Sequence, residues 1–216
     1  MKRLSYRKVG LLGALYFAQG MPYGFQAKAL PIYLRSHGVD VLTITFLEVL
    51  ALPWMLKALW APLVDRYGSE RIGRRKSWIV PMQVGLVLTC VAAAFVPIQG
   101  QLPLLLGLVL LMNLFAATQD IAVDGFAVDL LEPHELGGGN SAQVMGYKLG
   151  MLTAGGLLVW MIDVIHWRGL FLAMALLSLL VLGVVLMTRE PRSAVKGTKG
   201  ERMSWPELRD KMRADP

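Results

Sequence analysis

The sequence contains a single cysteine, Cys90, among its 216 residues. That cysteine stands alone in an apolar stretch, so it supports neither a disulfide framework nor a cysteine-rich metal site. The three histidines, at positions 37, 134 and 166, all fall in predicted loops or at the ends of apolar segments, with no nucleophile or ligand cluster beside them. This scarcity argues against an enzyme, and we expect no catalytic residue, metal or cofactor.

Charged residues are also scarce. Only 17% of the residues are charged, 55% are hydrophobic, and the mean hydropathy is +0.51. A chain of this composition is too apolar for an ordinary soluble globule and is typical of a protein that lies in a lipid bilayer. The formal net charge of +7 does not indicate a nucleic-acid partner, because the basic residues form no stripe interleaved with aromatic residues.

Long apolar segments take up most of the chain. A transmembrane helix needs about 20 mostly apolar residues, and six segments approach or exceed that length. They cover residues 9–34, 41–64, 78–96, 102–123, 141–162 and 167–187. We therefore expect an all-α membrane protein with six transmembrane helices, because helices satisfy their own backbone hydrogen bonds in hydrocarbon. Residues 1–188 would form this bundle and residues 189–216 a linker.

The basic residues predict how the bundle is oriented. Seventeen of the 22 lysines and arginines fall in the termini and loops of one side, two fall on the other side, and three lie inside the predicted spans. Since positive loops stay in the cytoplasm, both termini are expected there, in an inner or plasma membrane. The first segment is too long for a cleavable signal peptide.

The linker contains a possible amphipathic helix. Trp205, Leu208 and Met212 are spaced so that one helical face would carry all three. This helix could lie on the cytoplasmic membrane surface. A solvated linker with a chance apolar spacing explains the same pattern equally well.

Polar residues follow one face of the first segment. Tyr16, Gln19, Tyr23 and Gln26 are three or four residues apart, and Asn113 lies alone among apolar residues of the fourth segment. Lipid contact would be costly for these groups, so we expect them to face the bundle interior or an aqueous cavity. They are interpreted either as a substrate pathway or as interhelical hydrogen-bonding groups.

Several charges lie within the predicted spans. Lys28 and Glu48 should lie at similar depth, and we expect them to pair, as a structural ion pair or a proton-coupling site. Near the cytoplasmic end, Lys57 and Lys148 should lie level with the carboxylates of Asp120 and Asp124, which share one helical face. Either Lys148 meets an anionic substrate, or both lysines neutralise these carboxylates.

An acidic stretch breaks the pattern of positive loops. No lysine or arginine occurs from the end of the fourth segment to the start of the fifth, whereas five acids do: Asp120, Asp124, Asp129, Glu132 and Glu135. We expect this stretch to face the basic loop of Arg66, Arg71, Arg74, Arg75 and Lys76 across the cytoplasmic mouth. The basic loop could alternatively only set topology and bind anionic headgroups.

Small residues recur on the fifth segment. Gly146, Gly150 and Ala154 are four residues apart and form a ladder that lets another helix approach closely. We interpret this ladder as a packing feature.

The loop after the second segment resembles a known signature. Asp65-Arg66 followed by Gly73-Arg74-Arg75 is similar to the Gly-x-x-x-Asp-Arg-x-Gly-Arg-Arg pattern of the major facilitator superfamily, with Ala61 in the first glycine position and the middle lengthened. Three further segments resemble its branch of AmpG-type muropeptide permeases and acetyl-coenzyme A transporters: Leu56 to Pro62, Ala117 to Asp124, and Gly146 to Met151. Gln19 to Gly24 and Leu131 to Gly137 look most like an animal subgroup of that branch.

The resemblance implies a secondary transporter built from two six-span halves, of which this chain would be the amino-terminal one. Its partners would be a small amphiphilic or anionic substrate, the bilayer, and either a missing C-terminal half or a second copy. Asp65, Arg66, Arg74 and Arg75 would form a latch with Asp120 or Asp124. Gly125-Phe126-Ala127 departs from the aromatic and basic residues of muropeptide permeases. A non-transporting scaffold or receptor remains the alternative.

Overall fold

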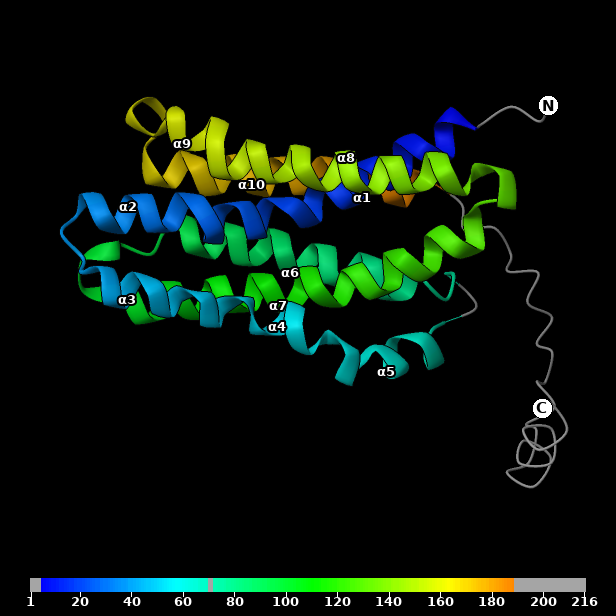
Figure 1. The fold of residues 1–216 in the computed structure, drawn as a ribbon, viewed down its shortest axis with the longest axis horizontal. Helices are drawn as coiled ribbons and strands as arrows, with labels where there is room; N and C mark the ends of the chain where they lie inside the picture. The colour runs from blue at the N-terminus through cyan, green and yellow to red at the C-terminus, as the bar shows by residue number, and fades with distance from the viewer. Residues whose placement is uncertain (1–4, 70–71, 189–216) are drawn as a thin grey trace, which may run out of the picture.

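A computed structural model describes residues 5–69 and 72–188, and every regular element in these two ranges is a helix. The helices run roughly parallel or antiparallel to one another in an elongated bundle (Figure 1). The predicted linker of residues 189–216, including its amphipathic helix, lies outside the described residues.

The first predicted span is one continuous run of helical turns that changes type in the middle. It consists of α1 (Tyr6–Gly24), a π-helical segment η1 (Phe25–Ala29) and α2 (Leu30–Ser36). Pro22 lies inside α1, three residues before the π segment. A proline has no N–H to donate, so the regular hydrogen-bond ladder cannot continue unchanged past it.

The second predicted span is more broken. Its elements are α3 (Val41–Thr45), the 3₁₀ segment η2 (Phe46–Ala51), α4 (Leu52–Leu56), the 3₁₀ segment η3 (Lys57–Leu59) and α5 (Ala61–Arg66). Pro53 and Pro62 lie in the first turns of α4 and α5. The missing N–H of proline is tolerated there, which explains why each proline begins a new helix.

The third and fourth predicted spans are uninterrupted helices, α6 (Lys76–Ala94) and α7 (Ile98–Leu130). The expected fourth segment ended at residue 123, but the helix does not end there. Helix α7 continues to Leu130 and includes part of the predicted acidic loop. At 1.5 Å per residue its 33 residues extend for about 50 Å, well beyond a hydrocarbon core of about 30 Å. Residues 124–130 therefore continue the helix beyond the apolar segment.

The last two predicted spans begin after a two-residue connection. They consist of the 3₁₀ turn η4 (Pro133–Glu135), α8 (Leu136–Leu152), the π segment η5 (Thr153–Leu157), the single turn α9 (Leu158–Trp160) and α10 (Ile162–Met187). Near its start α10 is kinked at His166, whose φ of 56° lies in the left-handed region.

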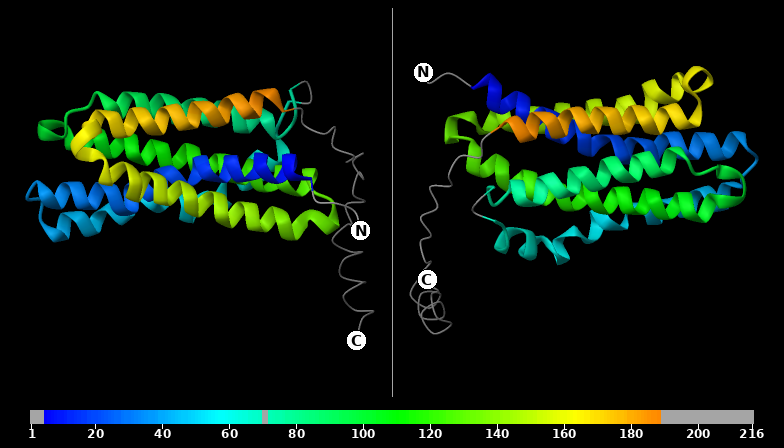
Figure 2. Two further views of the ribbon diagram at one scale, coloured as in Figure 1. Left: turned by 90° about the horizontal axis from the view of Figure 1, so that it is seen from above. Right: turned by 180° about the vertical axis from the view of Figure 1, so that it is seen from behind.

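Three helices of the described chain are long and apolar enough to cross a membrane individually: Lys76–Ala94, Gly100–Leu130 and Ile162–Met187. The other three predicted spans are runs of shorter helical elements, so the count of six remains a prediction. Helices α6 and α10 lie together on one side of the bundle, with α8 and α3 on the opposite side (Figure 2).

Glycines bring α1 and α8 into close contact. A Cβ at Gly150 would collide with the carbonyl of Phe17, and a Cβ at Gly20 would collide with the carbonyl of Tyr147. The two backbones therefore touch directly, and the packing expected for the ladder of the fifth segment is confirmed. The π segments continue this contact, since a Cβ at Gly155 would lie 2.6 Å from the carbonyl oxygen of Gly24.

The start of α1 and the end of α10 lie at the same end of the bundle (Figure 1). The connections between α5 and α6 and between α7 and α8 also lie at this end. The charged residues that flank these elements are therefore close enough to interact.

Candidate functional site

Two amides and an indole connect three helical runs inside the bundle. The Asn113 amide donates to Oε1 of Gln26 at 2.8 Å and accepts a hydrogen bond of 2.9 Å from the indole N–H of Trp54. Gln26 in turn donates to the carbonyl of Leu47 at 3.3 Å. Asn113 and Gln26 were predicted to be interior polar groups, and the structure brings them into direct contact. The contribution of Trp54 was not predicted.

An ion pair lies next to this group. The ammonium of Lys57, on η3, binds the carboxylate of Asp120, on α7, and lies 5.7 Å from the ring centroid of Trp54. Asp120 is buried, whereas the Lys57 side chain remains 34% exposed. Lys57 therefore neutralises Asp120, which is one part of the sequence interpretation that both lysines neutralise the two carboxylates, and its side chain remains partly exposed.

The second carboxylate of the pair has different partners. The Tyr16 hydroxyl donates to Oδ1 of Asp124 at 2.6 Å, and the Gln143 amide lies 3.4 Å from the same oxygen. Tyr16 is buried and Asp124 half-buried. Two carboxylates one turn apart on α7 are thus held differently, one by a cation and the other by neutral donors.

Three aromatic rings form a row that begins at Trp54, the ring beside Lys57. The rings of Tyr23 and Tyr147 have centroids 6.1 Å apart, and those of Trp54 and Tyr147 are 6.1 Å apart at an interplanar angle of 80°. All three side chains are half-buried. Tyr23 was predicted to belong to the polar stripe, but its aromatic neighbours on α4 and α8 were not.

The remaining residue of the stripe, Gln19, is fully buried, and neither atom of its amide has a hydrogen-bond partner among the described residues.

A second buried amide chain connects α6, α7 and α10. The Gln119 amide donates to Gln83 at 2.6 Å, and Gln83 donates to the carbonyl of Ser178 at 2.9 Å. The sequence analysis missed this chain, because its members lie singly in different apolar segments.

The predicted latch residues meet at the end of the bundle. Arg75 contacts Asp65 at 2.5 Å and Asp129 at 3.3 Å, and Arg74 lies 3.7 Å from Asp129. The acidic partner from α7 is therefore Asp129, and the expectation of Asp120 or Asp124 was wrong in this conformation. Asp129 lies more than one turn closer to the helix end, where α7 extends alongside the basic loop.

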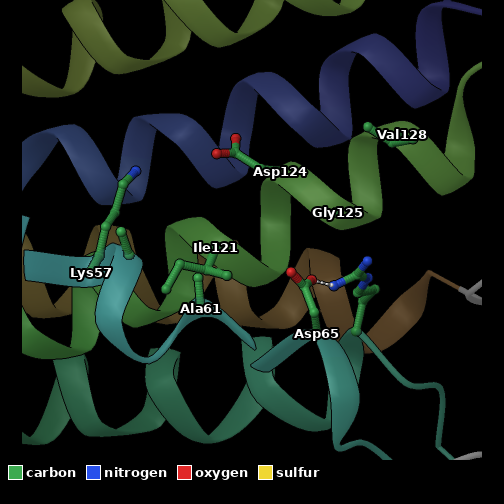
Figure 3. Close-up of a pocket in the computed structure, with 9 residues that line it drawn as sticks. Lys57, Ala61, Asp65, Ile121, Asp124, Gly125 and Val128 are labelled. Atoms are coloured by element: carbon green, nitrogen blue, oxygen red, sulfur yellow. Dashed lines mark hydrogen bonds and ion pairs between the residues drawn. The ribbon is translucent and has the colours of Figure 1, made fainter. Parts of the chain in front are cut away.

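A glycine makes room for this arginine. A Cβ at Gly125 would collide with the guanidinium of Arg75, so only glycine lets the guanidinium lie this close to α7. Gly125 also lines a pocket of about 500 Å³ between η3, α5 and α7, with Lys57 and Asp124 towards one end and Asp65 towards the other (Figure 3).

Four predicted site residues lie outside these networks. Lys28 and Glu48 are exposed and form no ion pair with each other in the described chain, so their expected pairing is not observed. Lys148, exposed on α8, does not reach Asp120 or Asp124, because Gly146 and Gly150 face α1 and turn Lys148 away. Arg66 is exposed at the end of α5 and takes no part in the contacts of Asp65 with Arg75.

Glu135 joins the start of α1 to the connection between α7 and α8. It accepts hydrogen bonds from the Lys8 ammonium at 2.6 Å and from the backbone N–H groups of Glu132 and Ser5, each at 3.1 Å. These donors, Lys8 above all, lower the pKa of Glu135 from 4.5 to about 2. The acidic stretch is thus in contact with basic groups from two elements.

Together, the helical bundle, its membrane-length apolar helices and its interior charges define a polytopic membrane protein with a polar interior. The family model of the Major Facilitator Superfamily matches residues 12–216. The chain belongs to this superfamily and, within it, to the AmpG-type branch. The superfamily is a family of membrane transporters. The animal subgroup suggested by the sequence remains a prediction.

Curated relatives support this assignment. The chain is 32% identical over 186 residues to a protein named anhydromuropeptide permease from Escherichia coli K12, covering 86% of this chain and 38% of that protein. It is 34% identical over 194 residues to an uncharacterized protein of Haemophilus influenzae, covering 89% and 45% respectively. A putative transporter, AmpG 4, from Rickettsia felis is 29% identical over 168 residues, covering 76% and 41%. The chain thus spans about two fifths of the length of these relatives.

Proposed function

We propose that the chain forms the amino-terminal half of a secondary active transporter that works by alternating access around a site near the middle of the membrane. The observation that carries this proposal is the Lys57–Asp120 ion pair, which lies inside the bundle but remains open on one side. Charges within a membrane bundle are costly, and such charges commonly mark a substrate or ion pathway. A purely structural pair would not need to stay accessible.

The substrate we propose is a small amphiphilic or anionic metabolite. Lys57 supplies the positive charge, and Gln26 and Asn113 supply neutral polar groups that connect to Trp54, the ring beside Lys57. An anhydromuropeptide, named for the Escherichia coli relative, and an acyl-coenzyme A are the first candidates to test. Proton coupling through Asp120 or Asp124 is part of the same proposal.

We propose further that Asp65, Arg74, Arg75 and Asp129 form a latch that stabilises one conformation of the transport cycle. It joins the α5–α6 connection to the end of α7, and these elements must separate if the bundle opens at this end. The bundle end that carries this latch would face the cytoplasm, with both termini, as the distribution of basic residues predicts.

Transport in sealed vesicles tests the proposal. The protein would be purified from its own membranes, reconstituted into proteoliposomes, and supplied with radiolabelled anhydromuropeptide or acetyl-coenzyme A, with and without an inward proton gradient. We expect uptake above that of protein-free vesicles, increased by the gradient and reduced at least tenfold in Lys57→Met. Uptake that ignores the gradient would remove proton coupling alone.

The second candidate function is a non-transporting membrane scaffold or receptor. In that case the protein would bind a ligand or a partner without moving any solute across the vesicle wall. Absence of uptake for every anionic metabolite tried, with folded protein in the bilayer, would favour this alternative over transport.

A further inference from the structure

A row of three aromatic rings begins beside Lys57: Trp54 lies next to the ammonium, Tyr147 next to Trp54, and Tyr23 next to Tyr147. Tyr23 comes from α1, Trp54 from α4 and Tyr147 from α8, so three separate helical runs each contribute one ring. We call these three rings, together with Lys57, the aromatic box. Its members are all half-buried, so a solute in the interior of a transporter could reach them.

The tryptophan of the box is held in place. Its indole N–H donates to Asn113, whose amide is in turn fixed by Gln26 and by the carbonyl of Val109 at 3.0 Å. This chain of hydrogen bonds fixes the indole plane before any ligand arrives. A pre-positioned aromatic surface loses little side-chain entropy on binding, which favours a recognition role over simple packing.

The ring spacing determines how a ligand could fit. Carbon atoms in van der Waals contact are about 3.5–4.0 Å apart, so a planar ligand inserted between two rings needs about 7 Å. The two centroid distances of 6.1 Å are shorter than that. A ligand ring must therefore lie against the exposed faces of the box rather than between its members.

Lys57 adds a requirement for negative charge. An ammonium has three N–H donors, and among the described residues Lys57 hydrogen-bonds to Asp120 alone. Two donors remain for an anionic group of the ligand, beside the face of Trp54.

Resting on the proposed transport function, we infer that the aromatic box is a binding subsite for a ring that carries an anionic group. The ring stacks on Trp54 and the tyrosines, while the anion takes the free donors of Lys57. Neither feature alone fills the subsite, so the ligand must bear both within one small unit.

Matched ligand pairs test this inference on the protein in lipid nanodiscs. N-acetylmuramic acid and N-acetylglucosamine share a sugar ring but differ in a carboxylate, and adenosine monophosphate and adenosine share a base but differ in a phosphate. D-lactate supplies an anion without a ring. Calorimetric titration should show at least tenfold tighter binding of a charged ring than of its neutral counterpart and of lactate, and the two pairs distinguish a sugar from a base.

Variants assign the effect to the box. Lys57→Met should reduce the affinity of the charged ring to that of the neutral one, while Trp54→Ala should weaken both. Because Lys57→Met leaves Asp120 without its cation, the double variant Lys57→Met/Asp120→Asn repeats the test without a buried unpaired charge. Arg168→Met, which removes a positive charge from α10 outside the box, is the matched control and should bind like the native protein.

Two results would overturn the inference: equal affinity for charged and neutral rings in the native protein, or an unchanged preference in both Lys57 variants. Neither result would affect the proposed function, because vesicle uptake is measured separately. Conversely, a charge-selective ring subsite in a protein that moves no solute would contradict transport and leave the subsite intact.

Discussion

The two intramembrane carboxylates of α7 show how one helical turn separates two chemical environments. Asp120 faces an ammonium, whereas Asp124 accepts hydrogen bonds from a phenol and an amide. Removing one member of a buried pair leaves the other charge without compensation, which is more costly than removing both. The contribution of the ion pair can therefore be isolated with paired substitutions.

Lys57→Met alone should destabilise the folded protein by about 1–3 kcal/mol, because Asp120 would remain buried without its cation. The double variant Lys57→Met/Asp120→Asn should recover most of that loss. Unfolding of purified protein in detergent, followed by circular dichroism against denaturant concentration, measures both. Additive losses from Lys57→Met and Asp120→Asn would show that the two groups do not interact.

Glu135 predicts a pH dependence at the end of the bundle. Its pKa is lowered from 4.5 to about 2, chiefly by Lys8, so the folded state prefers the ionised form. The resulting stabilisation is fully present above about pH 4.5 and is lost as the pH falls towards 2. Glu135→Gln should therefore lower the melting temperature by a few degrees at pH 6, and the difference should shrink as the pH falls below 4.5 and disappear only below about pH 2. A difference independent of pH would contradict this origin.

Position 125 provides a residue-scale test of the latch geometry. Gly125→Val should displace the Arg75 guanidinium and break its contact with Asp129, because the added side chain occupies the same space. We expect a larger population of molecules that are open at this end. Distances between spin labels on α5 and α7 measure this population, and the fraction at long distance should rise at least threefold. Gly107→Val, at a glycine of α7 with open space around it, is the control.

At the scale of the elements, helix contacts divide into glycine-mediated and polar ones. Helices α1 and α8 touch through glycines, and their π segments η1 and η5 pack against each other at the end of that contact. Helices α6, α7 and α10 are joined through buried amides. π segments often occur at functional sites. Here η1 contains Gln26, which is connected through Asn113 to Trp54 of the aromatic box.

The α1–α8 contact should not tolerate a larger residue. Gly150→Leu would collide with the backbone of Phe17, and backbone cannot move aside as a flexible side chain can. We expect a loss of at least 2 kcal/mol, in the range of severe core overpacking. Gly183→Leu, on α10 where a Cβ has free space, should leave the melting temperature unchanged. Equal losses at both glycines would contradict this origin, because leucine has the higher helix propensity and only a steric contact could cause the loss.

These elements also show what sequence patterns can reveal. The polar face of the first helical run, α1 and η1, was predictable, because the spacing of Tyr16, Gln19 and Gln26 is a property of one continuous run. Pairing between helices was not, since it depends on their relative register. Asp129, rather than the expected Asp120 or Asp124, pairs with Arg74 and Arg75, because α7 is longer than its apolar segment. Trp54, Gln83 and Gly125 likewise gain their roles only from neighbours on other helices.

At the scale of the whole molecule, the start of α1, the end of α10 and two connections share one end of the bundle (Figure 1). Cys90 is buried and is the single cysteine of the sequence, so a Cys90→Ser background is suitable for site-directed labelling. Ser69→Cys should react with a membrane-impermeant maleimide only from the cytoplasmic side, and His37→Cys only from the opposite side. Reaction of both from one side would refute an odd number of crossings between them.

The unequal lengths of the helices have a consequence for how the protein is assembled in the bilayer during synthesis. Helices α6, α7 and α10 are each long and apolar enough to cross the bilayer as single helices. The run that carries Lys57 is divided at prolines into shorter helices, and the countercharge of Lys57 is on Asp120, which is synthesised later. We therefore expect the ion pair of the second span to form only after α7 has entered the bilayer, so the final packing of the second span depends on the fourth.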